Sequence, residues 1–398
     1  SLLGPALTIP PLTLLFPGIL LALHAPIVAG FLPRLCGGVR AAAMQQTGIV
    51  YSHGSPEGID SANRARPALG SSTDSVICKV ICAGVNPVDA KGLVGDKLPG
   101  PLAALGKRLL DGRGVGFDFA GVVEDVPPGV STFKRGDAVY GTVPIAHGSF
   151  AQFVKTPLHQ IAHKPAHLSF AEAAALPLVG ITAVQALTQS NSLKPGEHLL
   201  LIGASGGVGH VAIQVAKALG ARVTAVCSGR NSALVSQLGA DFLVDYTAGE
   251  TAIKRQLDVA VQKVGRPFDL CLDCVFSFES KDQQIPYESL VRENNLLQGK
   301  YVTIGGGTPD WLRAGVRRTL GFNLFPKDRE LFWIVFPHTS EALAQLAAWA
   351  DAGKLRPRVA SEVPLEIGAV RQAFANLHGR RVVGKQVLRV FPDPPTVT

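Results

Sequence analysis

The sequence predicts an α/β protein with a small β-barrel domain, a doubly wound parallel-sheet domain and an apolar extension in front of both. One observation behind this prediction is a change of pattern near residue 170. Short β-type runs separated by turns come before it, whereas buried strands alternating with helices come after it. A second observation is a glycine-rich turn at residues 203–209, between a buried strand and a helix. The length of 398 residues is sufficient for two domains.

The part of the chain before residue 170 has the rhythm of a small barrel, because its apolar runs are short and turn sequences such as Pro127-Pro128-Gly129 separate them. The expected strands are Ser75–Cys82, Ala120–Val126, Asp137–Tyr140 and Phe150–Lys155.

The part after residue 170 alternates between strands and helices, which is typical of a parallel sheet covered by helices. The expected strands are His198–Ile202, Arg222–Cys227, Asp241–Val244, Leu270–Val275 and Tyr301–Ile304. The expected helices between them are Val211–Leu219, Asn231–Leu238 and Thr251–Val264, and a helix at Ser340–Ala352 and a strand at Lys385–Val390 follow.

The composition excludes several classes of protein. Hydrophobic residues make up 47% of the chain and charged residues only 17%, which excludes a disordered chain, a coiled coil and a charge-rich nucleic-acid tail. The net charge of +8 comes from 38 basic and 30 acidic residues without a long basic run. This balance suits anionic small molecules or an anionic membrane surface, and we expect no nucleic-acid partner.

The first 33 residues carry no charge, and Leu12–Leu32 is an apolar stretch of 21 residues. As a helix it would be roughly 30 Å long, enough to cross a bilayer, although Pro17 and Pro26 interrupt it. We expect residues 1–43 to anchor the protein in a membrane or to lie on one. A buried contact with a partner protein and a disordered leader are the alternatives.

The glycine-rich turn carries the clearest chemical signal. Ala204-x-Gly206-x-x-Gly209 is the dinucleotide-binding fingerprint with Ala in place of its first glycine. Gly206 lets the backbone approach a pyrophosphate, Gly209 lets helix and strand pack closely, and the helix N-terminus faces the phosphate charge. The turn residues expected to contact the cofactor are Ser205, Gly206, Gly207, Val208 and Gly209.

The next strand indicates which dinucleotide binds. NAD enzymes place an acidic residue about 20 residues after the turn, where it holds the ribose hydroxyls. Here the segment is Cys227-Ser228-Gly229-Arg230, without an acid. Because Ser228 and Arg230 suit a 2′-phosphate, the sequence favours NADP(H). An ordinary solvated turn is the alternative.

The same turn also fits a different enzyme class. Residues 203–207 match G-x-S-x-G, the nucleophile elbow of α/β-hydrolases, and His378 would then be the base. This interpretation leaves Gly209, Ser228 and Arg230 without a role.

Two further pairs of residues have the side chains that occur in metal or redox sites, but neither pair has the sequence context that such a site needs. Cys271 and Cys274 form a lone C-x-x-C without a second pair at zinc spacing, so we expect buried thiols and a reducing compartment. His163 and His167 straddle Pro165 and form no helical metal pair, so surface histidines are expected.

Besides the glycine turn, six further motifs stand in order along the chain: Gly84-Val85-Asn86-Pro87-Val88-Asp89, Gly116-Phe117-Asp118-Phe119-Ala120-Gly121, Phe133-Lys134-Arg135-Gly136-Asp137, Gly148-Ser149-Phe150-Ala151, Pro177-Leu178-Val179-Gly180-Ile181-Thr182 and Gly384-Lys385-Gln386-Val387-Leu388. By these motifs the chain from about Met44 to Val390 resembles the medium-chain dehydrogenase/reductase superfamily, and within it the zinc-free quinone oxidoreductase branch. Residues 1–43 lie outside the resemblance.

The resemblance implies a GroES-like catalytic domain at 44–175, a Rossmann NADP-binding domain at 176–328 and a return to the catalytic domain at 329–398, with 1–43 as the extension. It also implies reduction of a small hydrophobic acceptor by NADPH, either a quinone or the activated C=C bond of an enal or enone. Relatives of this kind are often homodimers. The implied cofactor contacts are Asn86 and Thr182 near the nicotinamide, Ser228, Arg230 and Tyr246 around the 2′-phosphate, and Ile304, Gly305 and Gly306 along the nicotinamide edge.

The resemblance further implies that no metal is bound. Zinc relatives carry Gly-His-Glu where this chain has Gly116-Phe117-Asp118, and the cysteine-rich lobe for a structural zinc is missing. Without a Lewis acid, alcohol oxidation is disfavoured, whereas the enolate formed from a conjugated acceptor needs only hydrogen bonds. We expect Asn86 or backbone amides to donate them.

Several relatives have a tyrosine soon after the Asn-Pro-x-Asp motif, but this chain continues with Ala90 and Lys91. The expected proton donor is therefore Lys91 or solvent, with a structural surface lysine as the alternative for Lys91. Asp89 is expected to be a hydrogen-bonding loop residue.

These expectations describe a zinc-independent, NADPH-dependent oxidoreductase held at an organelle membrane, either the mitochondrial inner membrane or the plastid envelope. The alternative is a non-catalytic NADPH-binding accessory subunit of a larger organellar membrane complex.

Overall fold

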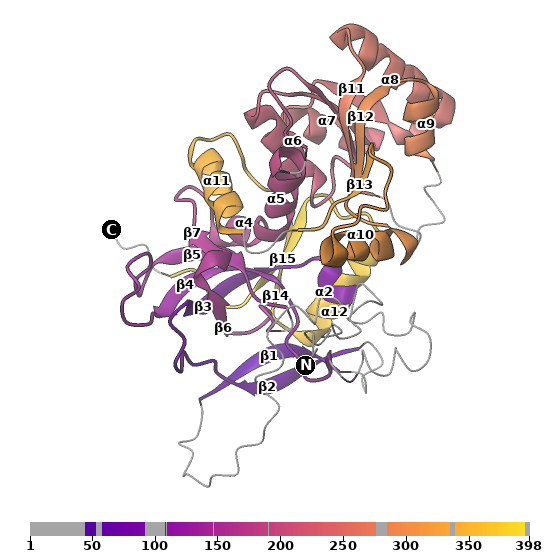
Figure 1. The fold of residues 1–398 in the computed structure, drawn as a ribbon. Coiled ribbons are helices and arrows are strands. Elements are labelled where there is room, and N and C mark those ends of the chain that lie inside the picture. Colours follow the sequence, from indigo (N-terminus) through magenta and orange to yellow (C-terminus); the bar gives the residue numbers. More distant parts are fainter. Residues whose placement is uncertain are drawn as a thin grey trace, which may run out of the picture.

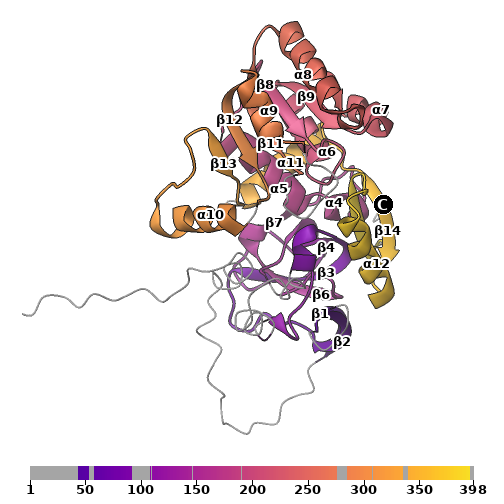
Figure 2. The same ribbon diagram turned by 90° about the vertical axis from the view of Figure 1, so that its right-hand side faces the viewer.

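The computed structural model (Figure 1) contains two large sheets that share a helical layer, and a separate two-stranded sheet. Figures 1 and 2 show the parallel sheet at one end, the other sheet at the opposite end, and α4 (Phe170–Ala174) and α5 (Pro177–Val184) between them. The structure describes residues 44–394 except 53–57, 92–107, 109, 146, 190, 276–284, 307 and 335–338. The predicted membrane segment, 1–43, lies outside the described residues.

The first domain, called the barrel domain below, is built on a seven-stranded sheet. Its order is β14-β15-β3-β4-β5-β7, with β6 paired to β3. The antiparallel pair β1 and β2 forms a separate sheet, and β1 makes single bridges to Ala151 and Gly114, which lie outside the strands of the seven-stranded sheet. The strands are β1 (Gln45–Tyr51), β2 (Ile59–Ala65), β3 (Ser75–Gly84), β4 (Asp118–Asp125), β5 (Ala138–Thr142), β6 (Phe153–Pro157), β7 (Ile161–His163), β14 (Val359–Pro364) and β15 (Lys385–Arg389).

Strand β3 is the centre of this sheet. It pairs with β4, β6 and β15, and all of its residues except Lys79 are buried. A strand buried on both faces needs apolar side chains in both alternating positions, which Ser75–Gly84 supplies with valine, isoleucine, cysteine and alanine. The C-terminal strand β15 therefore completes the first domain, although it lies near the other end of the chain.

The second domain, called the parallel-sheet domain, has the doubly wound order β10-β9-β8-β11-β12-β13 with every pair parallel. Its strands are β8 (His198–Ile202), β9 (Arg222–Cys227), β10 (Phe242–Asp245), β11 (Phe268–Asp273), β12 (Leu297–Thr303) and β13 (Arg329–Leu331). Its helices are α6 (Gly209–Ala218), α7 (Ser232–Gln237), α8 (Glu250–Val264), α9 (Tyr287–Glu293) and α10 (Thr308–Leu320).

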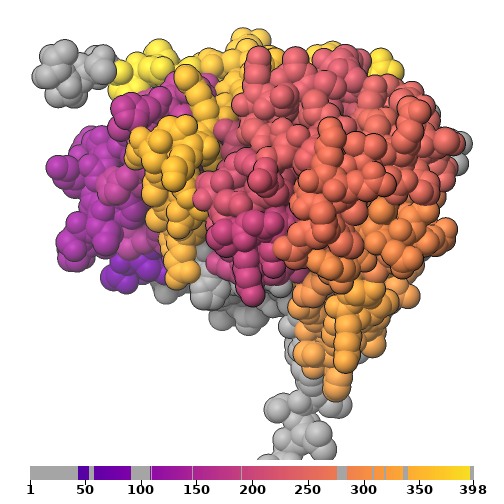
Figure 3. Space-filling view, turned by 90° about the horizontal axis from the view of Figure 1, so that it is seen from above, coloured from indigo at the N-terminus to yellow at the C-terminus, as the bar shows by residue number. Residues whose placement is uncertain are grey.

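Helix α11 (Thr339–Asp351) joins the two domains, and Figure 3 shows it in orange-yellow between them. The Tyr140 hydroxyl of β5 donates to the Leu343 carbonyl oxygen at 2.6 Å, and Thr339 Oγ1 donates to the His159 carbonyl oxygen at 2.9 Å. One apolar cluster runs from Ile81 in β3 through α5 and α11 to Leu201 in β8. The two domains therefore share a continuous core.

The predicted fold class is confirmed. The predicted strands at His198–Ile202 and Arg222–Cys227 coincide with β8 and β9. The β1–β2 hairpin, β13, β14, α10 and α12 (Ile367–His378) were not predicted. Strand β13, the edge of the parallel sheet, begins just after the expected boundary at residue 328. Within the described part of the chain, no helix is both long and apolar enough to cross a membrane.

Gly121 is the position where β3 and β4 approach most tightly, because a Cβ there would lie 2.1 Å from the Lys79 carbonyl oxygen. We expect Gly121→Ala to lower the free energy of unfolding by about 1–3 kcal/mol, as overpacking does. Urea unfolding followed by circular dichroism measures this change. Gly368→Ala is the control, since an added Cβ there meets nothing within 4 Å. Equal stability of both variants would contradict the tight approach.

Candidate active site

The glycine-rich turn links the buried strand β8 to α6. Gly203 has φ +78°, and a Cβ on Gly209 would lie 2.2 Å from the Gly203 carbonyl oxygen, so only glycine allows helix and strand to pack this closely. A Cβ on Gly206 would meet only that same carbonyl, at 3.3 Å. The turn is thus tight on its inner side and open beside Gly206, which fits a pyrophosphate approaching the backbone.

The other side of the turn rests on the barrel domain. The Gly384 N–H donates to the Ser205 carbonyl oxygen at 3.0 Å. A Cβ on Gly207 would lie 3.4 Å from Lys385 Cδ and 3.6 Å from Val179 Cγ1. Val208 directly precedes α6. The start of β15 and the dinucleotide turn are therefore in direct contact.

The segment after β9 contains a buried hydroxyl group without a partner. Ser228 is 4% exposed, and its Oγ has no hydrogen bond within the described structure. Such a group is costly unless a ligand satisfies it, so it fits a bound phosphate. Arg230 is exposed beside it, and Tyr246 is half-buried at the end of the neighbouring strand β10.

Asp245 shapes this segment from β10. Its Oδ1 accepts from the Gly229 N–H at 2.9 Å and from the Thr247 hydroxyl at 2.7 Å. The Thr247 hydroxyl hydrogen bond is the main reason why the pKa of Asp245 is lowered. The turn that carries Ser228 and Arg230 is thereby held by an ionised carboxylate.

A buried polar network lies on the barrel-domain side and centres on Asn86, which is 1% exposed. Its Nδ2 donates to Asp118 Oδ2 at 3.0 Å and, more weakly, to the Gly84 carbonyl oxygen at 3.5 Å. Its Oδ1 accepts from Lys385 Nζ. Both ends of the amide are therefore engaged within the protein, and Asn86 is held in one orientation.

Two carboxylates and one ammonium share this network. Asp118 and Asp89 are 0% and 3% exposed, and Lys385 is 4% exposed. Burial, followed by the charge of Asp118, raises the pKa of Asp89 to about 8, and burial raises the pKa of Asp118 to about 6. Burial also lowers the pKa of Lys385, while both carboxylates oppose that change. With one ammonium near two acids, one of the acids therefore holds a proton near neutral pH.

Asp89 fixes the loop that precedes α2 (Pro87–Lys91). Its Oδ2 accepts from the Asn86 N–H at 2.7 Å, and its carbonyl oxygen accepts from the Tyr51 hydroxyl at 2.8 Å. This is the hydrogen-bonding role that the sequence suggests for Asp89. Lys91 is the last residue of α2, and its side chain lies outside the described structure.

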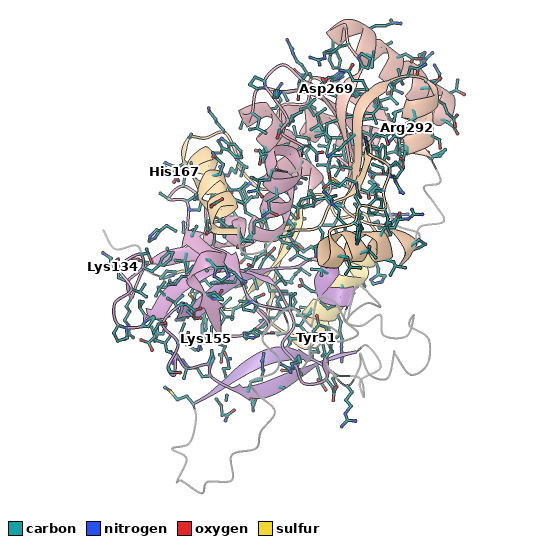
Figure 4. All side chains as sticks on the ribbon, in the orientation of Figure 1. Tyr51, Lys134, Lys155, His167, Asp269 and Arg292 are labelled. Carbon is teal, nitrogen blue, oxygen red and sulfur yellow. The ribbon has the colours of Figure 1, made fainter. Side chains whose placement is uncertain are left out.

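Of the residues expected near the nicotinamide, Asn86 lies on the barrel-domain side, whereas Thr182 lies on α5 and residues 304–306 lie in the parallel-sheet domain. Thr182 is 7% exposed on α5, and its hydroxyl donates to the Leu178 carbonyl oxygen at 2.7 Å. Ile304, Gly305 and Gly306 follow β12, and the Ile304 N–H donates to the Asp273 carbonyl oxygen at 3.2 Å. Figure 4 shows Asp269, near the start of β11, on the side away from the barrel domain. The carboxyl ends of the parallel strands, where such folds bind ligands, therefore face the junction of the two domains.

The alternative sites gain no support from the geometry. Ser205 Oγ accepts from Asn231 Nδ2 at 3.0 Å, while His378 Nδ1 lies 3.4 Å from the Phe374 carbonyl oxygen, so the two residues form no pair. Cys271 and Cys274 are free thiols whose pKa values burial raises. No group of three His, Cys, Asp or Glu residues suited to a metal occurs in the described ranges. Figure 4 shows His167 near α11, away from the glycine turn.

Asp118 and Lys385 are the site residues that the sequence does not single out. Both lie inside motifs that resemble the family, Gly116-Phe117-Asp118 and Gly384-Lys385, which is the only signal for them. Nothing in the local sequence brings Lys385 into this network, because its partner Asn86 lies 299 residues away.

The raised pKa of Asp89 makes the stability of the protein depend on pH. The folded state holds a proton that the unfolded chain releases above about pH 4, so stability falls as pH rises toward 8, by at most about 1.4 kcal/mol per pH unit. We expect Asp89→Asn to reduce the loss of stability between pH 6 and pH 8. Urea unfolding at both pH values tests this, with the exposed Asp60→Asn as control. Parallel pH curves for wild type and Asp89→Asn would contradict the assignment.

Comparison with known proteins gives a consistent family. Residues 72–166 match the alcohol dehydrogenase GroES-like domain, and residues 238–388 match the family described as zinc-binding dehydrogenase. NAD(P)H oxidoreductase RTN4IP1, mitochondrial, from Homo sapiens is 34% identical over 339 residues, which cover 80% of this chain and 82% of that protein. The chloroplast envelope quinone oxidoreductase homolog of Arabidopsis thaliana is 31% identical over 310 residues, covering 75% of this chain and 85% of that protein.

A solved structure extends the likeness to three dimensions. The quinone oxidoreductase from Coxiella burnetii superposes with a TM-score of 0.68 at 26% identity, covering 87% of this chain and all of that one. The glycine turn, the GroES-like sheet and these relatives agree with one another. The chain belongs to the medium-chain dehydrogenase/reductase superfamily and is a quinone oxidoreductase-like member of it.

Proposed function

We propose that this oxidoreductase uses NADPH, without zinc, to reduce a quinone or the activated C=C bond of an enal or enone. The observation that carries the proposal is a dinucleotide turn combined with the state of Asp118. This carboxylate lies in the run where zinc relatives bind their metal, and the protein itself already engages it in hydrogen bonds. Asp118 Oδ1 accepts from the Leu178 N–H at 3.0 Å, and its Oδ2 accepts from Asn86. Phe117, in the place of the histidine of zinc relatives, has no atom that binds a metal.

The cofactor assignment rests on residues that fit NADPH. The turn 205–209 would hold the pyrophosphate, and Ser228, Arg230 and Tyr246 would hold the 2′-phosphate. The unsatisfied Ser228 hydroxyl and the open side of Gly206 support this assignment. Thr182 and the backbone at 304–306 would border the nicotinamide, which supplies the hydride when bound.

The acceptor side needs hydrogen-bond donors for the oxygen that gains negative charge during reduction. Since Asp118 and Lys385 engage the Asn86 amide, we assign Asn86 to positioning and the donors to backbone amides or water. Lys91 or solvent would supply the proton that the acceptor takes up after it has received the hydride. Within the described network, the buried acids and the ammonium bond to the Asn86 side chain and to the backbone, and Lys385 pairs with Asp118.

The acceptor class follows the names of relatives. These include the chloroplast envelope quinone oxidoreductase homolog and an NADPH-dependent alkenal/one oxidoreductase of Arabidopsis thaliana. We also propose an organellar location, since relatives are named mitochondrial or chloroplastic. In this proposal residues 1–43 contact the membrane, and two chains form a homodimer.

We expect the protein to bind NADPH more tightly than NADH and to oxidise it rapidly on mixing with a quinone or a short enone. Fluorescence titration gives the affinities, and stopped-flow absorbance at the nicotinamide band gives the rate. Tight NADPH binding without oxidation would instead indicate a nucleotide-binding accessory subunit. Failure to bind either nucleotide would contradict the cofactor site.

Ser228→Ala tests the contact with the 2′-phosphate. Losing one hydrogen bond to a charged group costs about 1.5–3 kcal/mol, so we expect the NADPH Kd to rise roughly tenfold or more while the NADH Kd stays constant. Titration with both nucleotides measures this difference. Ser236→Ala on α7, an exposed serine, is the matched control. An equal effect on NADPH and NADH would remove Ser228 from the phosphate site.

A further inference from the structure

Lys385 links the polar network to the dinucleotide turn, because the residue before it, Gly384, bonds to the turn. It is the first residue of β15, and Gly384 before it has φ +87°. A Cβ on Gly384 would lie 2.4 Å from the Arg358 carbonyl oxygen, so the chain is confined at this point. The Gly384 N–H donates to Ser205 in the turn at 3.0 Å. The position of Lys385 relative to the turn is thereby fixed.

The stem of Lys385 lies beside the turn, and its ammonium lies in the polar network. Its Cδ faces the Gly207 position, whereas its ammonium donates to the Val85 carbonyl oxygen at 2.8 Å and to Asn86 Oδ1. Asp118 Oδ2 lies 3.7 Å from the same nitrogen. Two of the three ammonium hydrogens are therefore donated in hydrogen bonds, and Asp118 adds an ion pair.

The contacts continue from Asp118 to α5. Asp118 Oδ1 accepts from the Leu178 N–H at 3.0 Å, and the Leu178 carbonyl oxygen accepts from the Thr182 hydroxyl one turn later at 2.7 Å. Starting at the turn, an unbroken series of contacts thus runs through Lys385 and Asp118 to Thr182, with Asn86 attached to it.

We propose that Lys385 is a positioning residue that transmits occupancy of the dinucleotide turn to the loop at Asn86 and to Thr182. This proposal rests on the proposed function, since it takes the turn as the NADPH site. Lys385 itself touches neither cofactor phosphate nor acceptor in this role. Its ammonium sets the orientation of the Asn86 amide, and its stem lies against the Gly207 position of the turn.

A merely structural role differs from this one in a measurable way. A lysine that only neutralises Asp118 would affect the stability of the fold, and NADPH would change the loop equally with or without it. A positioning lysine makes the loop respond to the cofactor. Hydrogen–deuterium exchange of residues 85–91, with and without NADPH, reads this response directly.

The test uses Lys385→Met, which keeps the stem and removes the ammonium, and the double variant Lys385→Met/Asp118→Asn, which also removes the buried charge left behind. Lys155→Met is the matched control, because Lys155 is a half-buried lysine of the same sheet that donates to the Leu69 carbonyl oxygen. Figure 4 shows it in the barrel domain, away from the glycine turn. Should Lys385→Met fail to fold, the double variant carries the comparison.

We expect NADPH to slow exchange at residues 85–91 at least about threefold in the wild type and in Lys155→Met, and to leave it unchanged in the Lys385 variants. The NADPH Kd should change less than about threefold in every variant. In the enzyme assay, kcat should fall at least about tenfold in the Lys385 variants only.

Equal slowing of exchange in the Lys385 variants would overturn the proposal, as would a tenfold rise in the NADPH Kd with unchanged kcat, which marks a phosphate-binding lysine. If the wild type binds NADPH but reduces no acceptor, the proposed function fails, and the exchange measurement still decides the role of Lys385. A wild type that binds no NADPH overturns both.

Discussion

Charge removed from water must be compensated by partners in the protein, and at the junction of the two domains the Lys385 ammonium and the Asp118 carboxylate compensate each other. Lys385, Asp118 and Asp89 are all buried, and they bond to the backbone of Val85, Leu178 and Asn86, respectively. The arrangement holds the loop before α2, the start of α5 and the start of β15 at fixed positions. Removing Lys385 or Asp118 alone would leave the other charge buried without its counterion, whereas Asp89 holds a proton near neutral pH.

The cofactor side obeys a steric constraint instead. Gly209 leaves no room for a side chain against the Gly203 carbonyl, so the start of α6 packs closely against the end of β8. Beyond β9, the buried Ser228 hydroxyl has no partner among the described residues. The close packing at Gly209 defines where the pyrophosphate fits, and the unpaired hydroxyl supports the proposed contact with a 2′-phosphate.

Local features of the sequence predicted much of this structure. Strand β8, the turn and α6 are contiguous, so apolar runs and glycine spacing were enough to locate them. Strand β14 alternates half-buried and exposed residues, and β13 has three residues, so neither has a hydrophobic run to mark it. Lys385 and Asp118 meet only because β15 and β4 lie on opposite sides of β3, which no local pattern encodes.

Strand β15 also determines the order in which the protein can be made. The parallel sheet uses only residues 198–331, so it can form while the rest of the chain is still on the ribosome. The end of β3, residues 82–84, lacks its neighbour until residues 385–389 emerge, although β4 and β6 are already available to pair with the strand. During synthesis, this end of β3 is therefore an unpaired apolar edge, open to chaperones or to other nascent chains. The half of the molecule that is translated first is completed last.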